Sequence, residues 1–171
     1  MNPREELEIL KRGVEYSLDC FYERDSKLIR LKVNEPTLVG NFYRYFCEAI
    51  PELLADRRLR VDLEYDRCGE DGDQKARQSG SEHDTERPDM VVHRRGNSMR
   101  NVCMFEFKRY DSKVNRDEDF AKLREAVNPY WLRYHFGCFI EFGKNRLSSK
   151  VTWFCPERIG REWEDEVCPF V

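Results

Sequence analysis

The sequence predicts an α/β fold in which helices flank a mixed central β-sheet. Two N-terminal segments repeat apolar residues every three or four positions, the spacing of amphipathic helices. Five later segments are short and apolar or alternating, as strands are, and one helical segment precedes the fourth of them. Helices that flank a mixed sheet are the natural cover for this order of elements. The length of 171 residues suits one domain, which we expect to span residues 1–171.

The helices are predicted from apolar spacing and end signals. The first is expected over 3–27. The second should begin after Asn34, a suitable N-cap, with Pro36 in its first turn, and should end before Pro51. A third is expected over 117–134, with acidic residues at its start and a kink at Pro129.

Five strands are expected, and the second and third should form a hairpin across the turn "GNSMRN". The strands are "LRVDLEY", "DMVVHRR", "VCMFEFKRY", "HFGCFIEFG" and "VTWFC". Residues 66–87 contain almost no apolar side chains, so we expect a mobile loop, near the mouth of any site at the start of the second strand.

Composition excludes several classes of protein. No run of about 18 apolar residues is present and the N-terminus lacks a signal-peptide stretch, so we expect a cytoplasmic protein without a membrane span. The seven cysteines lie in apolar contexts without a C-x-x-C pair, which favours reduced thiols over disulfides or zinc. The net charge of −3 neither favours nor excludes a polyanionic partner, because local basic clusters exist.

The stretch "MFEFKRY" places two opposite charges inside an apolar strand. Alternate residues of a strand share a face, so Glu106 and Lys108 should point together, away from Phe105 and Phe107. Asp89 begins the preceding strand, so a hairpin would bring it close to Glu106. These charges are either an exposed cross-strand pair, worth well under about 1 kcal/mol, or a functional site.

The chemistry of this set favours a divalent metal ion. Two neighbouring carboxylates stay ionised at neutral pH only with a cation between them. Oxygen ligands without Cys or His at ligand spacing favour Mg²⁺ over zinc, with Mn²⁺ as a substitute. We therefore expect Asp89 and Glu106 to bind the metal. Lys108 would hold or deprotonate a water, or stabilise charge that develops on a phosphate.

The pattern formed by Pro88, Asp89, Glu106 and Lys108 resembles the signature of the PD-(D/E)xK nuclease superfamily. The resemblance implies a restriction-endonuclease-like αβββαβ core over about 34–155, with an N-terminal helical extension over about 1–30 and a C-terminal tail. It also implies that Glu35, at the start of the second helix, is a catalytic residue and a third metal ligand. A polar residue of the helix after the E-x-K strand often reaches the site, and Lys122 and Tyr134 are the choices here.

The function that this resemblance implies is Mg²⁺-dependent hydrolysis of DNA, leaving a 5′-phosphate and a 3′-hydroxyl. RNA remains open as a substrate, as does the choice between endonuclease and exonuclease. Arg94, Arg95, Arg109 and Lys122 are expected to contact nucleic acid. A homodimer is an option by fold analogy alone. The alternative function is a catalytically inactive nucleic-acid-binding or assembly protein that keeps the nuclease fold.

Overall fold

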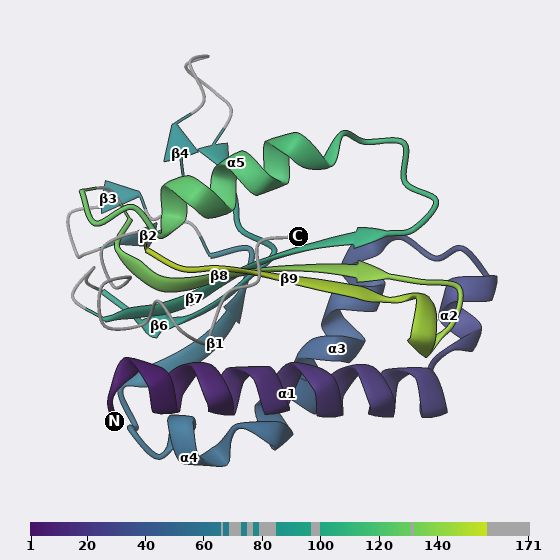
Figure 1. Cartoon of the computed structure of the whole chain (residues 1–171), viewed down its shortest axis with the longest axis horizontal. Coiled ribbons are helices and arrows are strands. Elements are labelled where there is room, and N and C mark those ends of the chain that lie inside the picture. The colour runs from purple at the N-terminus through teal and green to yellow at the C-terminus, as the bar shows by residue number, and fades with distance from the viewer. Residues whose placement is uncertain are drawn as a thin grey trace.

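The protein is an α/β structure built around one five-stranded mixed sheet (Figure 1). The computed structural model describes residues 1–65, 67–68, 73–74, 77–78, 85–96, 100–130 and 132–156. The strand order is β1-β6-β7-β8-β9. The strands are β1 (Leu59–Leu63), β6 (Met90–Arg94), β7 (Asn101–Arg109), β8 (Tyr134–Phe142) and β9 (Lys150–Phe154). The predicted fold class is confirmed.

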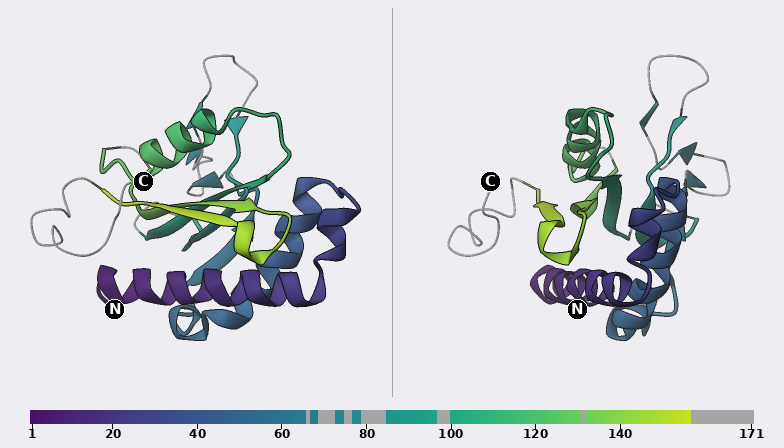
Figure 2. Two further views of the ribbon diagram at one scale, coloured as in Figure 1. Left: turned by 45° about the vertical axis from the view of Figure 1, so that its right-hand side comes forward. Right: turned by 90° about the vertical axis from the view of Figure 1, so that its right-hand side faces the viewer.

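Helices cover both faces of the sheet (Figures 1 and 2). One face carries α1 (Pro3–Arg24) and α3 (Glu35–Ala49), with the short helices α2 (Lys27–Arg30) and α4 (Pro51–Leu54) beside them. The other face carries α5 (Arg116–Ala126). A 3-10 turn, η1 (Arg146–Ser148), connects β8 to β9. The predicted starts of α1 and α3 are confirmed, and Asn34 caps α3 by accepting a hydrogen bond from the Thr37 amide at 3.2 Å.

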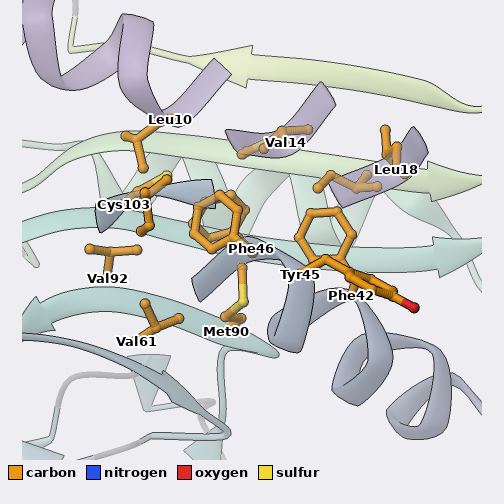
Figure 3. Close-up of a cluster of buried hydrophobic side chains, with 14 of the residues drawn as sticks. Leu10, Val14, Leu18, Phe42, Tyr45, Phe46, Val61, Met90, Val92 and Cys103 are labelled. Atoms are coloured by element: carbon orange, nitrogen blue, oxygen red, sulfur yellow. The ribbon is translucent and has the colours of Figure 1, made fainter. Parts of the chain in front are cut away.

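The larger core lies between the sheet and the pair α1 and α3 (Figure 3). In this core the apolar faces of the two helices pack against alternate residues of the strands. Figure 3 labels Val14, Phe46, Val92 and Cys103 among its members. A smaller core packs α5 against the opposite face, around Leu123 and Phe139. Since both faces are covered, the central strands are buried on both sides, as their nearly continuous apolar runs require.

The connection through α5 sets the polarity of the sheet. Strands β7 and β8 are parallel, and their register places Lys108 opposite Glu141. The other three strand pairs are antiparallel. The start of β6 therefore lies beside the C-terminal half of β7, and α5 begins at that same end of the sheet. Three chain segments thus meet where β7 ends.

Two sequence-based expectations are corrected. The helix predicted over 117–134 ends at Ala126, because a residue preceding a proline is driven out of the helical region and Pro129 stops the helix instead of kinking it. Within 66–87, the structure describes four two-residue strands that pair as β2 (Arg67–Cys68) with β3 (Asp73–Gln74) and β4 (Arg77–Gln78) with β5 (Thr85–Glu86). The expected mobility of this segment falls on residues outside those described, as does the C-terminal tail.

Two further expectations can be compared with the described residues. No helix among them is long and apolar enough to cross a membrane. Four cysteines in this part of the chain carry free thiols, as predicted: Cys20, Cys47, Cys103 and Cys138.

Gly13 is expected to be required where α1 meets α3. A Cβ atom at this position would lie 2.6 Å from Cγ2 of Ile50 and 3.1 Å from Cε2 of Phe46. Gly13→Ala should therefore lower the free energy of unfolding by about 1–3 kcal/mol through overpacking, despite the better helix propensity of alanine. Urea denaturation measures this change.

Gly40→Ala is the matched control, because Gly40 lies inside α3 with nothing within 4 Å of the added Cβ. There the helix propensity of alanine acts alone, so stability should rise by about 1 kcal/mol. If both variants shift stability in the same direction, the close approach of α1 to α3 at Gly13 is wrong.

Candidate active site

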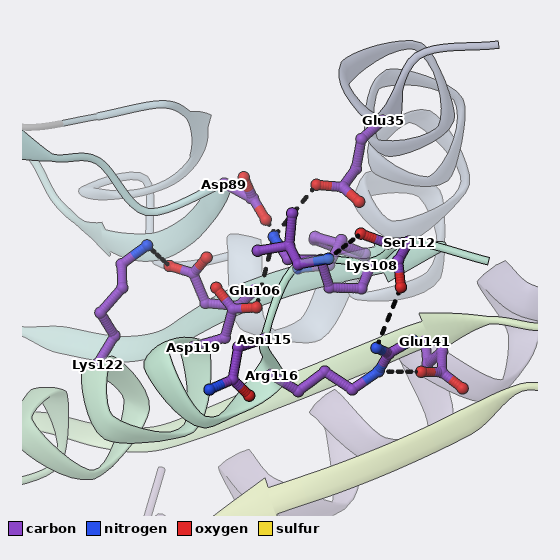
Figure 4. Close-up of polar contacts among 12 residues, drawn as sticks. Glu35, Asp89, Glu106, Lys108, Ser112, Asn115, Arg116, Asp119, Lys122 and Glu141 are labelled. Atoms are coloured by element: carbon purple, nitrogen blue, oxygen red, sulfur yellow. Dashed lines mark hydrogen bonds and ion pairs between the residues drawn. The ribbon is translucent and has the colours of Figure 1, made fainter. Parts of the chain in front are cut away.

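The alternation of side chains along β7 separates the charged residues from the core. Phe105 and Phe107 are fully buried in the core beneath α1 and α3. Glu106, 1% exposed, and Lys108 point instead to the side of α5 (Figure 4). The predicted shared face is confirmed, but it is not an exposed face. An exposed cross-strand pair is therefore the wrong description of Glu106.

Asp89 reaches this site from the strand next to β7. It directly precedes β6, whose first residue, Met90, pairs with Phe105. Its Oδ2 accepts a hydrogen bond from the backbone N–H of Phe107 at 2.7 Å. The carboxylate is thereby fixed on the backbone between Glu106 and Lys108, and Figure 4 shows it directed toward the Lys108 side chain.

Lys108 lies between two carboxylates that come from the starts of two helices (Figure 4). Its Nζ is 3.3 Å from Oε1 of Glu35, the first residue of α3. The same ammonium is 3.4 Å from Oδ2 of Asp119, in the first turn of α5. The second oxygen of Glu35 accepts a hydrogen bond from the Arg109 N–H at 3.3 Å. Lys108 therefore joins α3, β7 and α5 in one polar network.

Lys122 compensates the charge of Glu106. Its Nζ lies 3.0 Å from Oε1 of Glu106 as an ion pair. In the part of the chain that the structure describes, neither Oε1 of Glu106 nor Oδ2 of Asp119 has a hydrogen bond of good geometry, although both are buried. Ion pairs without such hydrogen bonds leave part of the desolvation cost of these oxygens unmet.

The electrostatics of the site follow from burial and crowding. Burial raises the pKa of Asp89 to about 6, against the opposing effect of the Phe107 amide and of Lys108. Burial, and then the charge of Asp89, raise the pKa of Glu106 well above its usual value. For Lys108 and Lys122 burial alone lowers the pKa, but the facing carboxylates outweigh it and both pKa values lie above the usual one. Both lysines are therefore charged at neutral pH.

The structure brings together five of the residues expected here, namely Glu35, Asp89, Glu106, Lys108 and Lys122, with Arg109 beside them. It does not bring Arg94 and Arg95 to them, because these residues lie at the opposite end of β6 from Asp89. Each residue along a strand adds about 3.3 Å to this separation. Arg95 instead pairs with Asp62, which also lies 2.8 Å from His93 Nε2. Tyr134 is not on the helix as expected: it begins β8, is buried in the core beneath α5, and pairs with Asn101 at the start of β7, away from Lys108.

Asp119 is the site residue that the sequence analysis missed. Its signal was the spacing to Lys122, since residues three apart on a helix share a face. Within the acidic run "DED" alone, however, nothing marks which of the residues faces inward. The packing of Leu123 into the smaller core decides it, because this packing turns Asp119 and Lys122 toward β7.

The donor chemistry fits a divalent ion such as Mg²⁺. Asp89 and Glu106 are hard oxygen donors close enough for their charges to interact, and the buried Oε1 of Glu106 has an ion pair with Lys122 but, among the described residues, no hydrogen bond of good geometry. Among the described residues, no group of three or more acidic, His or Cys side chains is close enough to hold a metal ion. If Asp89 and Glu106 held such an ion, its remaining positions would be filled by water or substrate oxygens.

Comparisons with known proteins leave the family open. No family model matches the chain, and no curated protein matches it. A solved structure described as the crystal structure of SSO0001 is similar over 91% of this chain and 72% of that chain, with 12% identity and a TM-score of 0.34. Likeness at this level supports no conclusion about family or function.

Asp89→Asn should stabilise the metal-free protein at pH 7 and have little effect at pH 4. Because the pKa of Asp89 is about 6 in the fold and about 3.9 in an unfolded chain, the folded state binds more protons between these values. The free energy of unfolding should thus fall as pH rises through this window. Asparagine has no such titration, and its amide oxygen still accepts from Phe107. The variant should gain on the order of 1–3 kcal/mol above pH 6, measured by urea denaturation in EDTA.

Asp111→Asn is the control of opposite sign. A hydrogen bond from Arg109 lowers the pKa of Asp111, so its contribution to stability is present above the unfolded pKa and disappears as pH falls through the lowered value. This variant should be no more stable than wild type at pH 7. A gain for Asp89→Asn that is equal at pH 4 and pH 8 would contradict the raised pKa.

Proposed function

We propose that the protein is a metal-dependent nuclease that hydrolyses phosphodiester bonds of DNA, with RNA open as a second substrate. One observation carries the proposal: two strands and the start of α3 bring Asp89, Glu106, Lys108 and Glu35 to one end of β7. The resemblance to the PD-(D/E)xK signature adds support, since its three charged residues, Asp89, Glu106 and Lys108, lie in this network. Membership of that superfamily remains a prediction.

Each side chain has a distinct part in this proposal. Asp89 and Glu106 would hold Mg²⁺ or Mn²⁺, which when bound supplies positive charge to the phosphate and favours deprotonation of water. Lys108 would stabilise charge that develops on the phosphate as the bond breaks, or orient the attacking water. Glu35 and Asp119 hold Lys108 from two sides, which limits its movement. Lys122 is placed to neutralise Glu106 before a cation binds.

The alternative is a catalytically inactive nucleic-acid-binding or assembly protein, and one observation favours it. Lys108 and Lys122 already face three of the carboxylates in the network, Glu35, Asp119 and Glu106. A network compensated in this way could act as a structural support between α3, β7 and α5 without binding a metal. Cleavage and metal-binding experiments distinguish the two functions.

Lys108→Ala should abolish DNA cleavage while the fold is kept. Loss of a group that acts mainly in the transition state lowers the rate on the order of a hundredfold or more. The assay follows cleavage of plasmid and of labelled oligonucleotides with Mg²⁺ or Mn²⁺, with EDTA as the blank and circular dichroism as the check of folding. Lys11→Ala is the matched control, because Lys11 pairs with Glu8 on the outer surface of α1.

The results separate the proposals. Activity of Lys108→Ala equal to that of wild type removes Lys108 from the mechanism. Wild-type protein that binds DNA but never cleaves it, with either metal and with single-stranded or duplex substrates, supports the inactive alternative.

Metal binding should be measurable without any reaction. A ligand present at a hundred times its dissociation constant stabilises the fold by about 2.7 kcal/mol, so saturating Mg²⁺ or Mn²⁺ should raise the melting temperature of wild type by several degrees. Glu106→Gln should lose this shift, because a neutral amide is a poor ligand for a hard cation. Glu8→Gln, on the surface of α1, should keep it. A shift of equal size in both variants places the metal elsewhere.

A further inference from the structure

A hollow of about 270 Å³ opens beside the candidate active site, between the start of α3 and the segment after β7. Its lining residues are Lys32, Val33, Asn34, Glu35, Arg109 and Ser112. Pockets for whole small molecules usually measure about 300–1,000 Å³. This hollow is smaller than that range, so it suits one chemical group of a larger ligand that continues outside it.

Three lining residues retain hydrogen-bond donors that no group among the described residues uses. Among the residues that the structure describes, Lys32 forms no ion pair, and Nη2 of Arg109 donates no hydrogen bond. The Ser112 Oγ accepts from the Val114 N–H at 3.3 Å, which leaves its own hydrogen available. An ammonium, a guanidinium edge and a hydroxyl around one hollow form a donor set for an anion with several oxygens, such as a phosphate.

The donors are held in place by the surrounding structure. Arg109 donates through Nη1 to the Val33 carbonyl at 2.8 Å and through Nε to Asp111, which fixes its guanidinium plane. Arg116 pairs with Glu141 of β8 and donates to the carbonyl of Ser112 at 3.4 Å. The segment that carries Ser112 is thereby attached to the sheet (Figure 4). A preorganised donor set binds with less loss of entropy than mobile side chains do.

The balance of charge at the hollow is positive. Glu35 lines it, but the Lys108 ammonium and the Arg109 amide, each at 3.3 Å, occupy its two oxygens. Asp111 pairs with Arg109 and also feels the charge of Lys32. Among the residues that line the hollow, two cations, Lys32 and Arg109, thus outnumber one carboxylate, Glu35. Because Glu35 belongs both to the hollow and to the contact with Lys108, an anion held here lies next to the site that would act on a phosphodiester.

We infer that the hollow binds a backbone phosphate of the substrate next to the scissile phosphate, through Lys32, Arg109 and Ser112. This inference rests on the proposed function for the identity of the neighbouring phosphate. The phosphate in the hollow sets the position of the strand, and the network around Lys108 acts on the next bond. Such a contact positions the backbone and is independent of base sequence.

The first test measures DNA binding in EDTA, so it does not depend on catalysis. Labelled oligonucleotides are titrated at several salt concentrations with wild type, Lys32→Ala and Ser112→Ala. Lys32→Ala should bind about tenfold more weakly, with a salt slope smaller by about 0.7–0.9 because one phosphate contact is lost. Ser112→Ala should bind several-fold more weakly with an unchanged slope, since a hydroxyl carries no charge. Lys11→Ala is the control that should match wild type in affinity and slope.

The second test replaces one phosphate at a time by an uncharged methylphosphonate on either side of the cleaved bond. At one position the replacement should raise KM for wild type several-fold with kcat nearly unchanged, and should have no further effect in Lys32→Ala. Lys32→Ala with wild-type affinity and salt slope would overturn the inference. So would additive effects of the variant and the replacement at every position, because the two would then act independently.

Two outcomes separate the hollow from the nuclease. If wild type never cleaves but Lys32→Ala shows the expected loss of binding and of salt slope, the hollow holds a backbone phosphate in a binding protein and the nuclease is wrong. If calorimetry shows that inorganic phosphate alone binds wild type and not Lys32→Ala, while DNA binding is the same in both, the hollow is a site for free phosphate and the inference about the backbone is wrong.

Discussion

Strand β7 is buried on both faces, and the alternation of its side chains determines what each face must supply. Phe105 and Phe107 fill the core beneath α1 and α3, so Glu106 and Lys108 must point into the layer beneath α5. A charge that is largely removed from water needs partners, and here they come from other elements. The positions of Asp89, Asp119 and Lys122 are consequences of this one strand and of the elements that pack on it.

The two helices contribute to the site through their N-terminal ends. Glu35 is the first residue of α3, and Asp119 lies in the first turn of α5. The positive end of a helix dipole favours a carboxylate at each position, which makes it less costly to gather acidic residues around one lysine. Asn34 and Asn115 cap the same helices, so local capping and the assembly of the site depend on the same short segments.

The sequence was sufficient to predict those features that follow from local periodicity. The starts of α1 and α3, the hairpin of β6 and β7, and the shared face of Glu106 and Lys108 each depend on spacing along a short segment, and the structure confirms them. The inward direction of Asp119 and the remote position of Arg94 and Arg95 depend on how elements pack and how strands align. A sequence motif lists charges without their partners, so the pairing of Lys122 with Glu106 could not be predicted from it. The end of α5 before Pro129 was predictable in principle, because proline stops helices more often than it bends them.

The ion pairs of this network leave part of the desolvation cost of its buried carboxylates unmet. A buried acid–lysine pair contributes to stability mainly when further hydrogen bonds satisfy its remaining oxygens. Among the described residues, Oε1 of Glu106 and Oδ2 of Asp119 are buried with an ion pair but no hydrogen bond of good geometry, and burial raises the pKa of Asp89 to about 6. Well-packed apolar side chains of similar volume often stabilise a fold at least as well as a buried ion pair does. Selection for stability alone therefore explains this network poorly, whereas the binding of a cation and a phosphate that we propose would account for it.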